Sequence, residues 1–274
     1  MVVDSYGPID SYFMGRRLNL FCLVVTVTVT LVTTLLMGVT VLSDNWEIIL
    51  YSRTKVETIA KVNRTNATVE ELFEGKTLIV TQWTNVSTAG QRDFLIQLHG
   101  GLWSVCWDLS EIEATQLEEL YPNATGVRCL DSLKEQEKYV DDTPFGTNSR
   151  QIRMQNLSIS CSLVCLIVLL SGLVVFWIGL IERQVPPVFV VSVLYLLAAV
   201  FAIFSLAIAR HRRQSNGPDC GMLDDQIDNI FIPARTFQTS WSVHLGWVAV
   251  SFCFLSAICV YTLSKLMRNS PFVI

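Results

Sequence analysis

The chain has 274 residues, of which 51% are hydrophobic and only 16% charged, and its formal net charge is −4 at pH 7. Proteins that bind nucleic acid present basic surfaces to the phosphates, so no nucleic-acid partner is expected for this chain. Its apolar residues gather in long runs, and these runs indicate the class of protein.

Four apolar runs without a charged residue are long enough to cross a bilayer, which takes about 20 helical residues. Four such runs are very unusual in one soluble domain, so buried core helices do not explain them. The first has too long an apolar core for a cleaved signal peptide, and no small-residue cleavage site follows before Asp44. The predicted spans are residues 18–42, 157–181, 188–209 and 243–263.

Basic residues near the span ends place both termini in the cytosol. Arg16 and Arg17 precede the first span, and Lys265 and Arg268 follow the last. Three arginines after the third span oppose this orientation: Arg210, Arg212 and Arg213. We give more weight to the basic residues before the first span and to the glycosylation motifs of the first outer loop, which are described below. The predicted order is a cytosolic segment 1–17, an outer loop 43–156, a cytosolic turn 182–187, an outer loop 210–242 and a cytosolic tail 264–274.

Four N-glycosylation motifs lie well within the first outer loop, at Asn63, Asn66, Asn85 and Asn123, and a fifth at Asn156 abuts the second span. One such motif is a weak signal, but four in a loop that the charges place outside predict a glycoprotein of the plasma membrane. Asn63 and Asn66 are so close that we expect only one of them to be efficiently occupied.

Of the eight cysteines, only Cys106, Cys129 and Cys220 lie outside the spans. In an oxidising compartment a Cys106–Cys129 bridge is the natural pairing. Cys220 then stays free, bonds a partner chain, or reaches Cys161 near the outer end of the second span. The cysteines within the spans are interpreted as small apolar side chains.

The first outer loop is the only segment large enough to form an extramembrane domain. Pairing of its last two predicted strands would bring Cys106 and Cys129 to bridging distance. Leu109, Ile112, Leu117 and Leu120 recur near helical spacing, which predicts a short amphipathic helix over 108–120. Apolar, β-branched or alternating residues predict strands at 46–51, 77–83, 94–98, 102–107 and 126–130.

Acidic residues outnumber basic ones by 17 to 11 in the first outer loop. A calcium site made from Asp108, Glu111 and Glu113 lacks the glycine turn of a calcium loop, so a solvated acidic face is favoured and no metal is expected. An acidic surface can favour cations near a pore, although it more often serves solubility. In the second outer loop, an apolar tip at 231–233 contacts either a partner or its own domain.

The sequence contains no catalytic motif. Its three histidines, His99, His211 and His244, are scattered, and no acidic residue lies inside a span. Intramembrane proteases and pumps need ionisable groups at membrane depth. His244 stands beside two tryptophans and is interpreted as part of an interfacial aromatic belt. We therefore expect neither an enzyme nor a cofactor.

The run Gly101-Leu102-Trp103, followed by Cys106 and Cys129 in the first large loop of a four-span chain, resembles the signature of the claudin superfamily. This superfamily contains the claudins, the peripheral myelin proteins, the calcium-channel gamma subunits and the AMPA-receptor regulatory proteins. Two further positions are similar to the family pattern. They are Trp46, after the first span, and a basic residue before the second span, Arg150 or Arg153.

The resemblance implies a membrane all-α four-helix left-handed bundle with an extracellular antiparallel β-sheet domain. It implies a sheet of about five strands stapled by a Cys106–Cys129 bridge. The two cysteines are separated by more residues than in barrier-forming claudins, and the loop is longer, which makes paracellular pore formation doubtful. Long glycosylated loops are more similar to the gamma-subunit and claudin-domain branches.

Two functions follow from the resemblance. One is the organisation of cell–cell contacts, as junction, adhesion or barrier; the alternative is an auxiliary subunit that modulates the gating or trafficking of an ion channel. The implied partners are the lipid bilayer and other membrane proteins, by claudin-like self-association or through a channel subunit. Phe272 and Ile274 at the C-terminus also fit a ligand for a cytosolic PDZ scaffold. A frayed tail on the membrane surface is the other interpretation.

Overall fold

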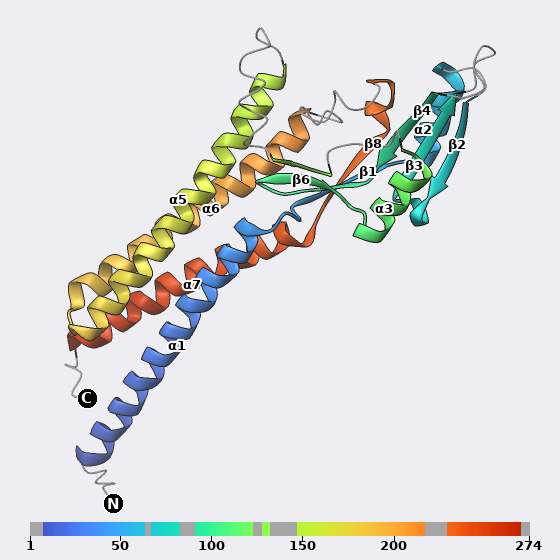
Figure 1. The fold of residues 1–274 in the computed structure, drawn as a ribbon. Coiled ribbons are helices and arrows are strands. Elements are labelled where there is room, and N and C mark those ends of the chain that lie inside the picture. The colour runs from blue at the N-terminus through green and yellow to red at the C-terminus, as the bar shows by residue number, and fades with distance from the viewer. Residues whose placement is uncertain are drawn as a thin grey trace, which may run out of the picture. The chain divides into compact units, whose positions relative to one another are not determined.

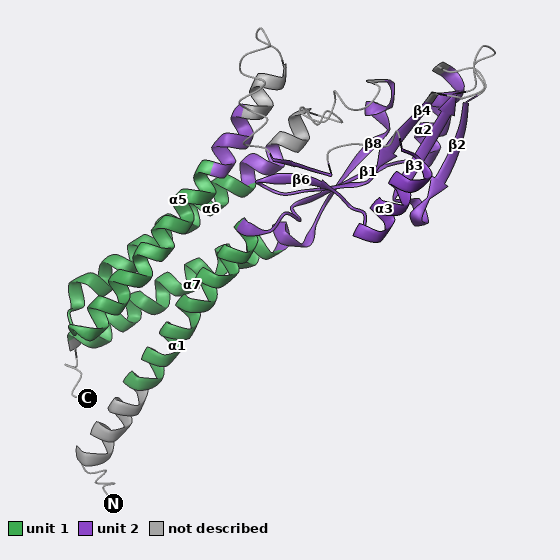
Figure 2. Ribbon diagram, in the orientation of Figure 1, with its two compact units in different colours: residues 1–41, 160–206, 245–274 green, residues 42–159, 207–244 purple. Residues whose placement is uncertain are grey.

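The computed structural model describes residues 8–63, 67–82, 91–122, 128–131, 147–216 and 229–269. The chain divides into two compact units (Figure 2). We call residues 1–41, 160–206 and 245–274 the helix bundle, and residues 42–159 and 207–244 the sheet domain. Each unit is described by itself.

Four long helices contain the predicted spans, and all four are long and apolar enough to cross a membrane. Three of them continue well beyond the apolar residues, because a helix that has already formed extends at little cost through polar helix formers. The predicted loops therefore begin and end within helix at several points. The helices are α1 Pro8–Leu42, α5 Thr147–Ile181, α6 Val185–Asn216 and α7 Trp241–Asn269 (Figure 1).

Hydroxyl side chains fill much of the interface that α1 makes within the bundle. Its buried residues recur every three or four positions and include Thr26, Thr30 and Thr33. Each of these threonines donates to a carbonyl one turn earlier, which satisfies the hydroxyl within the helix. Thr33 also bonds across to Ser256 of α7 over 2.7 Å between the hydroxyl oxygens. These hydroxyl groups thus have hydrogen-bond acceptors within their own helix, and Thr33 also links α1 to α7.

The sheet domain contains a five-stranded antiparallel sheet in the order β7-β6-β5-β1-β8. Four of its strands come from the first predicted outer loop, and β8 comes from the second. The strands are β1 Glu47–Tyr51, β5 Leu98–Gly100, β6 Ser104–Trp107, β7 Cys129–Asp131 and β8 Arg235–Thr239. The sheet of about five strands that the resemblance implied is therefore present.

A second sheet contains three antiparallel strands in the order β2-β3-β4. In the sequence these strands lie between β1 and β5, which are neighbours in the first sheet. Side chains alternate across β4, so Leu95 packs with α2 and the short helix η3, whereas Phe94 and Ile96 pack with Leu117 of α3. These three strands thus have a helix on each face. The elements are α2 Arg53–Asn63, β2 Ala67–Leu72, η1 Phe73–Gly75, β3 Thr77–Gln82, β4 Gln91–Ile96, α3 Glu111–Leu120 and η3 Asn229–Ala234.

The strands predicted at 46–51, 77–83, 102–107 and 126–130 correspond to β1, β3, β6 and β7, and the helix predicted over 108–120 corresponds to α3. The prediction of one strand over 94–98 was wrong, because the chain divides there at Gln97 into β4 and β5. Gln97 donates its backbone N–H to the Lys76 carbonyl and accepts from Asp108 at its own carbonyl, so it changes hydrogen-bond partners between the two sheets. Five elements were not predicted, namely α2, β2, η1, η3 and β8.

Candidate functional site in the disulfide-bridged sheet

The turn between β5 and β6 requires glycine at position 101. Gly101 is buried, and a Cβ atom there would lie 2.5 Å from the Asp44 Cα atom and 2.9 Å from its Oδ1. Backbone cannot move aside as the end of a side chain can, so any larger residue would displace the segment that leads into β1. The Gly101 N–H donates to the Ser104 carbonyl at 2.8 Å and closes the turn.

Trp46 extends the central strand by one residue on both sides. Its N–H donates to the Gly100 carbonyl at 2.8 Å, and its own carbonyl accepts from the Ser240 N–H at 3.0 Å. Its side chain is buried. The backbone of Trp46 thus links the segments of β5 and β8 on either side of β1 where the sheet begins.

Leu102 belongs to the turn between β5 and β6 and contacts α5. Its side chain is buried, and its carbonyl accepts a hydrogen bond of 2.7 Å from the Gln155 amide Nε2. Gln155 is itself buried and belongs to the first turns of α5. This bond holds the motif turn against α5 within the sheet domain. Arg153, two residues earlier, is exposed.

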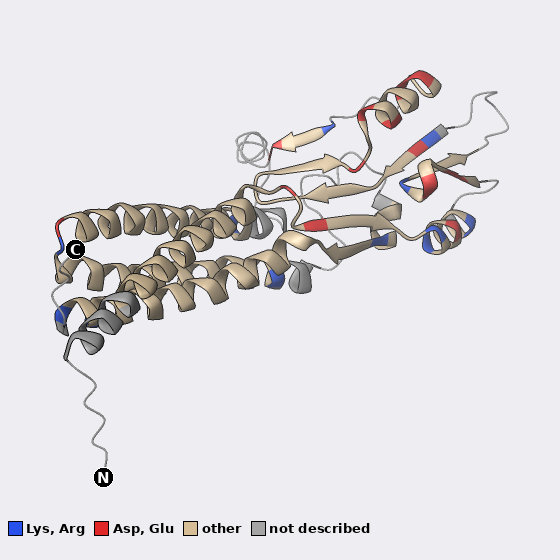
Figure 3. Cartoon of the chain, turned by 90° about the horizontal axis from the view of Figure 1, so that it is seen from below, with Lys and Arg blue, Asp and Glu red and all other residues tan. Residues whose placement is uncertain are grey.

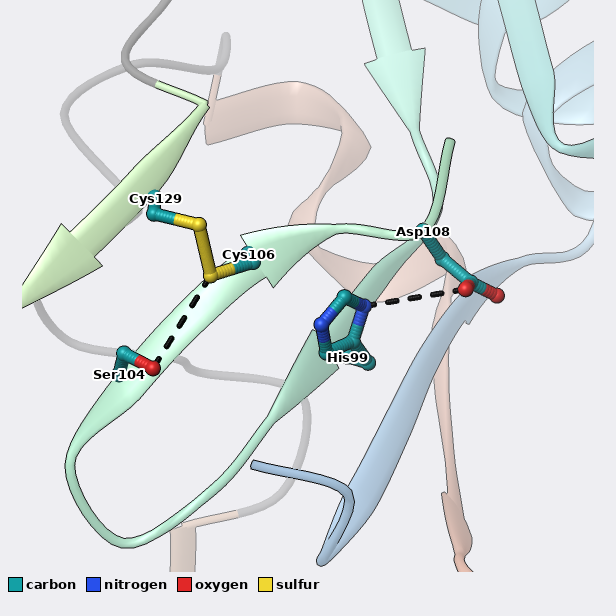
Figure 4. The surroundings of a disulfide bond; sticks show 5 residues. All are labelled: His99, Ser104, Cys106, Asp108 and Cys129. Carbon is teal, nitrogen blue, oxygen red and sulfur yellow. Dashed lines mark hydrogen bonds and ion pairs between the residues drawn. A yellow bond between two sulfur atoms is a disulfide. The ribbon is translucent and has the colours of Figure 1, made fainter. Parts of the chain in front are cut away.

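The disulfide between Cys106 and Cys129 joins β6 to the short edge strand β7 (Figure 4). The two residues are directly opposite in the register, with 4.1 Å between their Cα atoms. Their position in neighbouring strands was the arrangement predicted from the sequence. Because β7 has only three residues, the covalent bond supplies much of what holds this edge in place.

A family model described as PMP-22/EMP/MP20/Claudin tight junction matches residues 31–261. The chain belongs to this family. The match runs from within α1 into α7, so it includes α5, α6 and both sheets and parts of the first and last long helices. No curated protein matches the chain in addition. The chain is thus a multi-pass membrane protein with claudin-like architecture, in which four long helices accompany an antiparallel sheet domain.

Two of the carboxylates that we considered as calcium ligands have protein partners in this claudin-family chain. Asp108 accepts from the Gln97 amide at 2.9 Å and lies 3.7 Å from His99 Nδ1 (Figure 4). Glu113 accepts from the Ser110 N–H at 2.8 Å and pairs with Lys76 Nζ at 3.1 Å. Within the described residues, no group of three His, Cys, Asp or Glu side chains is placed to hold a metal.

Two salt bridges tie α3 to Lys76 and Arg128, and a capping box stabilises its first turn. Ser110 and Glu113 cap each other's backbone N–H groups at the start of the helix. These bonds, together with the Lys76 ammonium, hold the pKa of the Glu113 carboxyl below its ordinary value. Near the end of α3, Arg128 binds both carboxylate oxygens of Glu118, at 2.9 Å each from Nη2.

The apolar face predicted for α3 is only partly correct. Leu117 is fully buried against Ile96, but Ile112 and Leu120 are 72% and 60% exposed. Ala114 takes the buried place one turn before Leu117. Helical spacing therefore did not distinguish the buried Leu117 from the exposed Ile112 and Leu120.

The apolar tip of the second loop packs on its own domain. Phe231 is fully buried among Val56, Leu78 and Leu95, and Ala234 joins the same cluster. The following residues form β8, which pairs with β1 over its whole length. The two alternatives left open for this tip are therefore resolved in favour of intramolecular packing. No pattern in the polar sequence of β8 predicted this strand.

Several predicted site residues lie outside the described part of the chain. They are Asn66, Asn85, Asn123, Cys220, Phe272 and Ile274. Asn63 is the last residue of α2, and Arg150 lies in the first turn of α5. Charged residues are concentrated in the sheet domain, whereas the four long helices carry few between their ends (Figure 3).

Proposed function

We propose that this protein organises cell–cell contacts at the plasma membrane through its sheet domain and catalyses no reaction. One observation carries the proposal. Both loops between the spans fold into one sheet, in which β8 pairs with β1 and the opposite edge is closed by the Cys106–Cys129 bond. A module built from both loops has a defined surface, and a protein partner can bind to such a surface without a cavity for a small substrate.

The proposal requires the sheet domain to lie outside the cell and both termini to lie in the cytosol. Three features support this orientation. Disulfides persist in oxidising compartments, the glycosylation motifs occur in the sheet domain, and basic residues flank the first and last spans. Glycosidase treatment should collapse several gel bands to one near 30.8 kDa, the mass of the bare chain. An unshifted band would contradict this orientation.

The test of the contact function is expression in cells that form no junctions. The protein should concentrate at borders between two expressing cells, and less at borders between an expressing and a non-expressing cell. A change in transepithelial resistance, or freeze-fracture strands, would assign a barrier role within this function. Uniform distribution over the cell surface would contradict the proposal.

A second candidate function is an auxiliary subunit of an ion channel. The observation that favours it is the inserted module of α2, β2, β3 and β4, which enlarges the first loop between β1 and β5. Such an addition supplies surface beyond what the disulfide-bridged sheet needs. Co-purification of a channel pore subunit from native membrane would support this candidate, and its loss on replacing residues 53–96 with a short linker would locate the contact.

We also propose that the C-terminal tail binds a PDZ scaffold in the cytosol. An extended tail adds a strand to the PDZ sheet, and residues at the last position and two before it fill pockets on one side. Ile274→Ala should weaken capture by a PDZ panel roughly tenfold, which corresponds to about 1.4 kcal/mol. Unchanged capture, with unchanged localisation of a protein lacking 270–274, would leave a tail that lies on the membrane.

A further inference from the structure

The outer strand of the three-stranded sheet has a neighbour on one side only. β2 pairs with β3 over all six of its residues and stands at the end of the order β2-β3-β4 (Figure 1). In such a strand every second residue directs its backbone N–H and C=O groups away from the neighbouring strand. Among the residues that the structure describes, no backbone group outside β3 hydrogen-bonds to β2. The outer edge of β2 is therefore an unpaired row of backbone donors and acceptors.

The two faces of β2 have different chemistry. Val69 packs on the apolar cluster under α2, whereas Thr68 and Glu70 alternate with it and are exposed on the other face. Glu71 returns to the α2 face, where Arg53 binds its carboxylate over 2.7 Å. Glu70 forms no salt bridge within the described part of the chain. One face of the edge is thus apolar, and the other carries an unpaired negative charge.

The acidic residues of β2 disfavour a second copy of the chain at this edge. Full-length antiparallel pairing of two β2 strands places Val69 of one copy opposite Glu70 of the other. Glu70 of each copy then lies diagonally across from Glu71 of the other, within reach of such long side chains, and like charges repel there. A foreign strand with a lysine or arginine opposite Glu70 gains an opposite-charge pair instead.

The other edge of this sheet is a poorer match for a basic segment. Arg92 of β4 is exposed, and its guanidinium carbon lies 5.1 Å from the centroid of the Tyr121 ring. A lysine or arginine added beside β4 would meet this positive charge. Charge complementarity therefore directs a basic segment to β2.

We propose that β2 binds an extended basic segment of a partner protein, which adds a fourth strand to the sheet. Main-chain hydrogen bonds to the unpaired edge supply the affinity, and alternate side chains supply the specificity. A lysine or arginine lies opposite Glu70 on one face. A small or β-branched residue lies beside Val69 on the other face and extends the apolar cluster under α2.

This inference rests on the proposed function, because it names the chemistry of a protein partner for the sheet domain. One competing occupant of the edge is evident from the sequence. The glycosylation motif at Asn66 immediately precedes β2, so a glycan there would cover the start of the strand. The experiment therefore includes removal of this motif.

The experiment measures the binding of fluorescent synthetic peptides to the full-length protein in detergent micelles. The first peptide alternates lysine with valine or threonine, and the second has glutamate in place of lysine. The third has two adjacent prolines at the centre of the first, which remove a backbone donor from each of its edges. We expect the lysine peptide to bind saturably and the other two to bind at least roughly tenfold more weakly, which corresponds to about 1.4 kcal/mol.

Charge reversal locates the binding site. Glu70→Lys should weaken the lysine peptide roughly tenfold and strengthen the glutamate peptide, because the charge opposite the peptide changes sign. Glu119→Lys is the matched control, since Glu119 is an exposed acid on α3, outside β2. Hydrogen exchange of the β2 amides should slow when the lysine peptide binds, whereas exchange in β8, an edge strand of the other sheet, should not change.

Four results would overturn the inference. They are no binding, equal binding of all three peptides, equal effects of Glu70→Lys and Glu119→Lys, and binding that appears only in Asn66→Gln protein, which would show that a glycan covers the edge. These outcomes are separable from failure of the proposed function. Specific peptide binding, combined with uniform distribution of the protein over the cell surface, would keep the inference and refute the contact role. Enrichment at cell borders without peptide binding would do the reverse.

Discussion

Thr33 and Ser256 are buried in the helix bundle, where Leu170 is 56% exposed; in the sheet domain Leu117 and Phe231 are fully buried, and charged residues cover the surface. In both units the solvent decides which side chains are buried, but the helix bundle faces lipid and the sheet domain faces water. Lipid does not drive leucine into a protein interior, so small hydroxyl residues that allow close helix approach occupy the bundle interfaces. Water does drive leucine inward, so the sheet domain has apolar cores. An exposed leucine is therefore expected on the lipid-facing surface of the helix bundle, whereas it is unfavourable on the water-facing surface of the sheet domain.

The largest contrast is expected from arginine at exposed apolar positions in the two units. Leu170→Arg places a charge near the middle of the second predicted span, which costs about 3–4 kcal/mol relative to leucine on insertion scales. Val62→Arg, at a position 77% exposed on α2, should change stability by less than about 0.5 kcal/mol. Membrane-insertion efficiency and the yield of folded protein measure both effects. Equal tolerance would mean that α5 does not face lipid.

Loss of the disulfide should be the next largest effect. Cys129→Ser opens a loop with a sequence separation of 23 residues, and chain entropy predicts a loss of roughly 3 kcal/mol. We expect retention in the secretory pathway and a lower thermal midpoint of the purified protein. Cys259→Ser in the bundle is the matched control and should behave like the unchanged protein, because Cys259 is a free thiol. Peptide mapping that recovers Cys106 and Cys129 as thiols would contradict the prediction.

A smaller effect is expected from the hydroxyl pair between α1 and α7. Thr33 and Ser256 lie 2.7 Å apart, and interhelical hydrogen bonds in membranes average about 0.6 kcal/mol in double-mutant cycles. The cycle of Thr33→Val and Ser256→Ala, read from unfolding in mixed micelles, should return a coupling of that size. Thr28→Val is the control, because Thr28 is exposed and bonds only to carbonyls of its own helix. A coupling near zero would assign the pair to close packing alone.

The smallest expected effect is a pH dependence confined to the sheet domain. The pKa of Glu113 is lowered by the Ser110 N–H, the Lys76 ammonium and the Ser110 hydroxyl. A lowered folded-state pKa contributes stability that is present above the ordinary value of 4.5 and is lost as the pH falls through the folded pKa. The protection of the α3 amides against hydrogen exchange, taken relative to the intrinsic rate at each pH, should therefore fall in acid.

Glu113→Gln should lower the protection of α3 at neutral pH and remove most of its further fall in acid. Protection within the spans should stay constant, because they contain no Asp or Glu. A fall in protection of equal size in both units would show that the effect is global and does not arise at the α3 cap.

The sequence determined the membrane architecture, because a span needs only a long uncharged run. Each of the four runs lies within one helix, and the family match agrees with the motif around Gly101. The disulfide was also predictable, since two cysteines outside the spans fall in segments with strand character. Orientation, glycosylation and the PDZ tail remain predictions.

Only the tertiary structure decided how the sheet domain is assembled. The polar strand β8 forms because β1 offers it a row of backbone partners, and such long-range pairing leaves little trace in its own residues. Gln97 divides one apparent strand into two for the same reason. Burial along α3 depends on what lies beneath each position, so Leu117 is buried and Ile112 exposed although both are apolar. Local sequence specifies which segments are apolar, and contacts between distant segments decide which side chains are buried.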